Sequence, residues 1–152
     1  MRIQYTPLDP SDASITKENT DRLDDIVSYQ SLGDEKVDTV HGVDKAAANG
    51  DTRGEWEWRA KGLLKLAGKL AHSHWEVLGW GEEEMGNKWV VTVFAKTLFT
   101  PAGIDIYSKD RTGVHPETLG KIKNALQEIE DEDVKKMAGE IFKIKVDDAR
   151  KD

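Results

Sequence analysis

The chain has 152 residues, no cysteine and a formal net charge of −7. The length suits one ordinary domain, and 38% hydrophobic residues with five tryptophans are too many for a disordered chain. The absence of cysteine excludes disulfides, thiolate metal sites and cysteine nucleophiles, while the acidic balance argues against nucleic acids and anionic membranes as partners.

The N-terminal residues do not show the pattern of a signal peptide. They contain no apolar core and reach a proline at Pro7, so we expect no signal peptide. No stretch approaches the roughly 20 apolar residues that a membrane span needs. We therefore expect a cytoplasmic protein, with the nucleus as the alternative.

The first predicted element is a helix. Residues 1–15 are expected to form an extended lead-in because their prolines disfavour a helix. Thr16 can then cap a helix over residues 17–32. The apolar stripe of this helix contains Leu23, Ile26 and Val27, and Leu32 can extend it.

Strand patterns follow in the middle of the chain. Residues 37–43 suit a short edge strand, and Trp56 and Trp58 share one face of the next strand because they alternate with charged residues. Residues 62–74 fit either a short helix or a bulged strand, and we favour a strand as far as Leu66.

A hairpin gives the clearest pattern. Residues 75–81 and 88–98 are strand-like and flank a polar turn, and residues 104–108 form a further strand. Both faces of the segment 88–98 are largely apolar, which predicts a central strand that is covered on one side and on at least part of the other.

The C-terminal third is helical. One helix is expected to begin at Pro116 and a second to follow the acidic cluster 130–133, and the residues from Asp147 onward should fray. We predict a single α+β domain over residues 1–146, with a frayed tail over 147–152. Its fold would be a curved, mostly antiparallel sheet of about four to six strands, packed by an N-terminal helix and two C-terminal helices.

Tryptophan is the most unusual feature, because all five tryptophans lie on three neighbouring predicted strands. They could line a pocket for a small apolar or aromatic ligand, or fill the core between the sheet and the helices. Trp75 and Trp80 differ in parity and point to opposite faces unless a bulge intervenes. The candidate ligand-binding residues are Trp56, Trp58, Trp75, Trp80 and Trp89.

His72 and His74 are weak candidates for catalysis or metal binding. In a strand they project on one face together with Glu76, as a metal-ligating histidine pair requires. The pattern resembles the first motif of the cupins, but the cupin spacing to glutamate is longer and the second cupin motif has no counterpart here. We expect two ordinary histidines, no metal and no cofactor.

Asp105 is the third weak catalytic candidate. It stands between two isoleucines in a predicted strand, where partial burial would raise its pKa and let it act as a base. We favour the alternative, an aspartate on the solvent-exposed side of the sheet. The sequence contains no nucleophile elbow and no phosphate-binding loop.

Three stretches resemble those of a family of small uncharacterised fungal proteins, over most of residues 3–146. They are GEWEWR, SHWEVLGWG and FAKTLFTPAGIDIYSK. The resemblance implies a fungal source and an intracellular setting, and it carries no activity, substrate or functional residue.

The sequence therefore favours a non-enzymatic binding module with a tryptophan-lined apolar pocket. A protein-interaction or oligomerisation domain, present as a monomer or a homodimer, is one alternative. A small cone-shaped α+β barrel enzyme with an Asp/His acid–base pair is the other.

Overall fold

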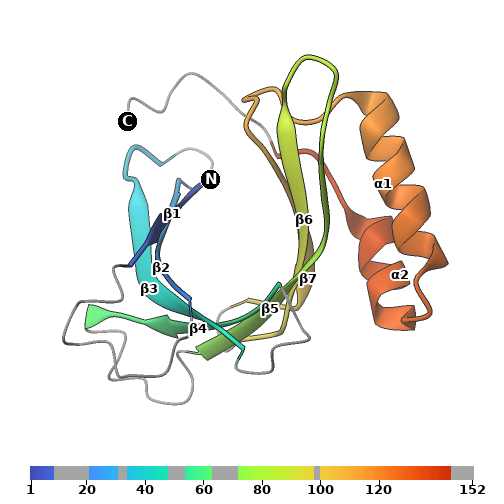
Figure 1. The fold of residues 1–152 in the computed structure, drawn as a ribbon. Helices are drawn as coiled ribbons and strands as arrows, with labels where there is room; N and C mark the ends of the chain where they lie inside the picture. Colours follow the sequence, from blue (N-terminus) through green and yellow to red (C-terminus); the bar gives the residue numbers. More distant parts are fainter. Residues whose placement is uncertain (9–20, 31–33, 48–53, 63–71, 98–99, 145–152) are drawn as a thin grey trace. The chain divides into compact units, whose positions relative to one another are not determined.

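A computed structural model describes residues 1–8, 21–30, 34–47, 54–62, 72–97 and 100–144. Within these ranges the chain forms seven strands and two helices, and the strands follow one another in the sheet in chain order. The strands are β1 (Arg2–Pro7), β2 (Arg22–Tyr29), β3 (Asp38–Ala46), β4 (Glu55–Ala60), β5 (His72–Glu82), β6 (Lys88–Phe94) and β7 (Gly103–Ser108), and the helices are α1 (Pro116–Glu128) and α2 (Glu132–Glu140) (Figure 1).

The chain divides into two compact units, to both of which strand β5 contributes. Unit 1 comprises Met1–Glu76 with Ala95–Pro101, and unit 2 comprises Val77–Phe94 with Ala102–Asp152. Unit 1 holds β1 to β4 and the beginning of β5, and unit 2 holds the rest of β5, β6, β7 and both helices. The single domain over residues 1–146 stays a prediction, and the tail 147–152 lies outside the described residues.

The predicted N-terminal helix is wrong, because Arg22–Tyr29 forms strand β2. Strands β1 and β3 pair with β2 antiparallel along its two edges and satisfy its backbone groups, which a helix would have satisfied internally. Leu23 and Val27 share one face of this strand and Ile26 lies on the other, so the three do not form one stripe. The predicted fold class therefore fails at its N-terminal helix, and its strand number is too low.

Two further segments differ from the prediction. The expected lead-in contains strand β1, which tolerates Pro7 because β1 is an edge strand. The expected short edge strand is β3, which is nine residues long and lies between β2 and β4. The segment 62–74 falls mostly outside the described residues, although His72 and the residues after it belong to β5.

The hairpin β5–β6 and the two C-terminal helices are present as predicted. The backbone N–H of Glu83 donates to the carbonyl of Asn87 at 3.0 Å, and Gly86 supplies the left-handed conformation of the turn with a φ of 81°. Helix α1 has Pro116 in its first turn, and the Asp131 carboxylate accepts from two backbone N–H groups at the beginning of α2.

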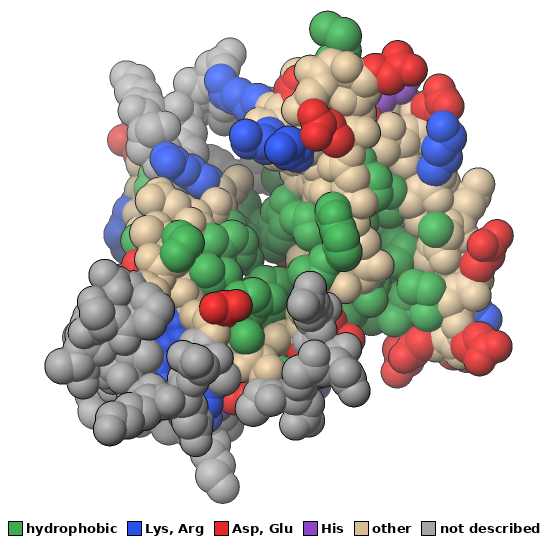
Figure 2. Space-filling model, in the orientation of Figure 1, with side chains coloured by type: hydrophobic (Ala, Val, Ile, Leu, Met, Phe, Trp, Pro, Cys, Tyr) green, Lys and Arg blue, Asp and Glu red, His purple; other side chains and the backbone are tan. Residues whose placement is uncertain are grey.

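Unit 2 buries one apolar core between its sheet and its helices. The buried residues are Val91 from β6, Ile122 and Leu126 from α1, and Val134 and Ala138 from α2. Strand residues including Leu78, Trp89, Ile104 and Ile106 pack against them. Figure 2 shows apolar side chains gathered between the helices and the sheet of this unit.

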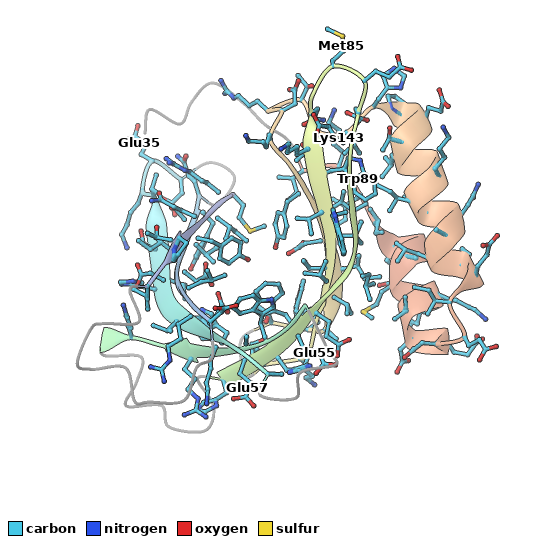
Figure 3. All side chains as sticks on the ribbon, viewed as in Figure 1. Glu35, Glu55, Glu57, Met85, Trp89 and Lys143 are labelled. Atoms are coloured by element: carbon cyan, nitrogen blue, oxygen red, sulfur yellow. The ribbon has the colours of Figure 1, made fainter. Side chains whose placement is uncertain are left out.

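Leu126→Ala should destabilise the protein by about 2–5 kcal/mol, because Leu126 is only 3% exposed and the substitution leaves a cavity in this core. Urea unfolding followed by circular dichroism measures the loss. Met85→Ala is the control: Met85 is 96% exposed at the tip of the β5–β6 hairpin (Figure 3), so its change should stay within about 0.5 kcal/mol. Equal losses in the two variants would contradict this assignment of the core.

Candidate functional site

The strand register gives unit 1 two chemically different sheet faces. Residues directly opposite each other in an antiparallel pair share a face, so each pairing carries the assignment to the next strand. The aromatic face consists of Ile3, Tyr5, Pro7, Leu23, Asp25, Val27, Tyr29, Asp38, Val40, Gly42, Asp44, Ala46, Trp56, Trp58, Ala60, Ser73 and Trp75. The alternate residues of the same strands form the charged face.

Three aromatic rings stack on the aromatic face. Trp56 and Trp75 are opposite each other on β4 and β5, with ring centroids 5.6 Å apart and an interplanar angle of 12°. Tyr5 stacks on Trp75 with a centroid distance of 5.9 Å. Since Tyr5 comes from β1, the sheet of unit 1 must curve strongly to bring its first and fifth strands together around these rings.

Trp58 crosses the backbone of β3 at Gly42. A Cβ atom at position 42 would stand 2.2 Å from the indole Nε1 of Trp58, so glycine is required for this close approach. Gly42 is opposite Asp25 on β2, and Trp58 forms a hydrogen bond with the Asp25 carboxyl group. An indole on β4 thus reaches a carboxyl group two strands away.

Trp75 repeats this arrangement one strand further along the sheet. Its indole Nε1 on β5 donates a hydrogen bond of 2.7 Å to Oδ1 of Asp44 on β3. Sequence reasoning named both tryptophans as candidates but missed their aspartate partners, because aspartate is usually found at exposed positions.

Both aspartates are buried, with Asp25 5% exposed and Asp44 0% exposed. Within the described ranges, Oδ1 of Asp25 and Oδ2 of Asp44 have no hydrogen-bond partner. Burial and, after it, the charge of Asp44 raise the pKa of Asp25 to about 7, against the hydrogen bond from Trp58. Burial raises the pKa of Asp44 to about 6, against the hydrogen bond from Trp75.

Asp24, the neighbour of Asp25, lies on the charged face and has the opposite environment. Its carboxylate bonds to Nε2 of His41 at 2.9 Å and to the ammonium group of Lys61. The hydrogen bond from Lys61 is the largest cause that lowers the pKa of Asp24, and burial opposes it. Asp24, His41 and Lys61 thus form a cluster on the charged face in which the carboxylate has two basic partners.

The charged face also carries the two candidate histidines. His72, His74 and Glu76 project on the same side of β5 as predicted, and Nε2 of His74 lies 3.0 Å from Oε1 of Glu76. Both histidines line a shallow depression together with Glu57. Figure 3 shows the Glu57 side chain on the outer side of the sheet. The described residues contain no group of three or more side chains arranged to hold a metal ion.

Asp105 lies on β7 in unit 2. It is opposite the buried Thr92, and its Oδ2 accepts a 2.5 Å hydrogen bond from the hydroxyl group of Tyr107. Burial raises the pKa of Asp105, and the Tyr107 hydrogen bond opposes this shift. Because His72 and His74 belong to unit 1, neither unit by itself contains the hypothetical Asp/His pair.

The five candidate tryptophans divide between the units. Trp56, Trp58 and Trp75 belong to the aromatic face of unit 1, whereas Trp80 and Trp89 belong to unit 2. Trp89 packs against the core beneath the helices (Figure 3), and Trp80 is 77% exposed. Unit 1 therefore combines three tryptophans with two buried carboxyl groups and is the candidate site.

No protein-family model, curated protein or solved structure matches this chain. The resemblance to fungal proteins accordingly stays a prediction. In the described part of the chain, neither helix has the length and apolar character needed to cross a membrane.

Asp25→Asn should stabilise the protein at about pH 8 by about 2–4 kcal/mol and have little effect near pH 4. Asp25 has a folded-state pKa of about 7 against 3.8 for the unperturbed group, so the wild-type protein loses stability as the pH rises through this interval. Urea unfolding at the two pH values measures the difference.

Asp24→Asn is the matched control, and its effect on stability at about pH 8 should have the opposite sign. The lowered pKa of Asp24 means that its carboxylate contributes stability above its unperturbed pKa, and this contribution disappears as the pH falls. The variant should therefore be less stable than the wild type at about pH 8. Destabilisation by Asp25→Asn at that pH would contradict the assignment of Asp25 as an uncompensated buried acid.

Proposed function

We propose that unit 1 is a binding module for a small molecule with an aromatic body, which stacks on the aromatic face. The stack of Tyr5, Trp56 and Trp75 supports this proposal, because flat rings offer a large contact area to a flat ligand. These rings keep part of their surface accessible, with Tyr5 40% exposed. Covering that surface would contribute roughly 25 cal/mol per Å² before the costs of association.

Contacts within the protein orient the stack before any ligand arrives. Trp56 and Trp75 are cross-strand neighbours, and the hydrogen bond to Asp44 fixes the orientation of the Trp75 indole. Side chains that are already ordered lose little entropy on binding, so more of the contact energy remains as affinity. This arrangement favours the binding module over a loosely packed aromatic cluster.

Small aromatic compounds such as 2-phenylethanol and indole should bind saturably, as calorimetry and quenching of tryptophan fluorescence measure. Trp56→Ala removes one ring of the stack and should weaken binding at least about tenfold, since a hot-spot aromatic residue contributes about 2 kcal/mol or more. Trp80→Ala, at an exposed position in unit 2, is the control and should leave the affinity unchanged. The absence of saturable binding up to millimolar concentrations would refute the proposal.

Self-association through unit 2 is a second candidate function, which the exposure of Trp80 favours. A tryptophan that is 77% exposed is unusual in a monomer, and Trp is enriched at the centre of protein interfaces.

Light scattering should show a dimer for the wild-type protein at about 100 μM, a concentration at which interfaces with a Kd in the micromolar range are occupied. Trp80→Ala should shift the mass towards the monomer, whereas Met85→Ala, which removes another exposed apolar side chain of unit 2, should not. A wild-type protein that stays monomeric at this concentration would exclude this candidate.

A further inference from the structure

We infer that the ligand of the aromatic face is an organic cation, a protonated amine whose N–H groups bond to the buried carboxyl groups of Asp25 and Asp44 while its apolar body stacks on the tryptophans. The inference rests on the proposed function and goes further by naming the chemical class of the ligand.

The first argument is the unused hydrogen-bonding capacity of the two carboxyl groups. Trp58 and Trp75 each supply one indole hydrogen bond, and one oxygen of each aspartate stays without a partner among the described residues. Buried carboxylates without a partner are costly, and proteins usually pair them with a cation. The aromatic face thus presents two acceptors that an ammonium group can satisfy.

The second argument is the charge of the face itself. Besides the two buried aspartates, its titratable residues within the described ranges are Tyr5, Tyr29 and Asp38, and none is basic. The basic residues of β2 and β3, which are Arg22, His41 and Lys45, lie on the charged face, where His41 and Lys61 bond to Asp24. A positive charge for the aspartates must therefore come from outside these residues, and a cationic ligand would supply it.

The third argument is the kind of cation that this surface suits. Indole faces attract cations through the ring quadrupole, most strongly when water is excluded. A divalent metal ion prefers six or more oxygen ligands, and the described residues contain no metal-binding group of three. Aromatic walls around a pair of carboxyl groups therefore favour an organic ammonium ion over an inorganic one.

The geometry allows one ammonium group to serve both aspartates. Asp25 is opposite Gly42, so Asp44 is its diagonal neighbour on the same face, with Cα atoms roughly 7–8 Å apart. An ammonium group has three N–H donors, enough for both open oxygens. The Trp58 indole lies over Gly42, between the two aspartates, so the ammonium group reaches both oxygens only where this ring turns aside.

The decisive experiment compares 2-phenylethylamine with 2-phenylethanol, which has the same body without the charge. Calorimetry at about pH 7.5 should give at least tenfold tighter binding of the amine. The preference should shrink several-fold as the pH falls to about 5.5, because protonation of the two aspartates removes their charge, while binding of the alcohol should not change.

Asp44→Asn tests the residue assignment, because it keeps the acceptor for Trp75 and removes the charge. This variant should lose most of the preference for the amine and keep its affinity for the alcohol. Glu57→Gln removes the same charge from the opposite face of β4 and should keep the full preference (Figure 3). Circular dichroism checks that both variants are folded.

The outcomes separate this inference from the proposed function. Equal affinities for amine and alcohol would overturn the inference and leave the aromatic binding module standing, whereas failure of both compounds to bind would overturn both. Tight competition by Mg²⁺ or Ca²⁺ alone would also overturn it, since the aspartates would then belong to an inorganic cation site. An amine preference that Glu57→Gln reduces as much as Asp44→Asn would indicate attraction by net charge only and would count against it.

Discussion

Unit 1 depends on hydrogen bonds between indoles and carboxyl groups across its sheet. A buried carboxylate needs donors and a buried indole N–H needs an acceptor, so Trp75 donates to one oxygen of Asp44 at 2.7 Å and Trp58 bonds to Asp25, while the second oxygen of each aspartate has no partner among the described residues. Each bond joins two strands that are separated by a third, and it fixes the positions of the two joined strands relative to each other. Among the described residues of unit 1, Ala60 alone is a buried apolar side chain, whereas unit 2 has a conventional aliphatic core.

This difference explains which parts of the fold could be predicted. The helices of unit 2 follow from apolar residues at helical spacing, and the hairpin follows from two alternating runs around a polar turn. Strand β2 was missed because its inward position 25 holds an acid, which hides the alternation between Leu23 and Val27. The residue that makes this acid tolerable is Trp58, which is far away in the sequence.

The candidate site, too, could be predicted only where local sequence patterns determine it. Alternation correctly placed Trp56 with Trp58, and His72 with His74 and Glu76, because parity within one strand is a local property. The grouping of three tryptophans with two aspartates depends on the pairing of five strands, and no local pattern contains that information. The aspartates were therefore absent from the candidates, although they distinguish this face chemically from a plain aromatic core.

The adjacent pair Asp24 and Asp25 has a consequence for how β2 finds its register. A slip of this strand by one residue would exchange its two faces and keep an aspartate at only one of the two places. In one direction Leu23 would take the place of Asp24 beside Lys61, and in the other Ile26 would take the place of Asp25 beside Trp58. The doublet therefore disfavours a slip in either direction, because Lys61 or Trp58 loses its carboxyl partner. Two adjacent acids with different partners thus help to specify the register that buries Asp25 and leaves Asp24 on the charged face.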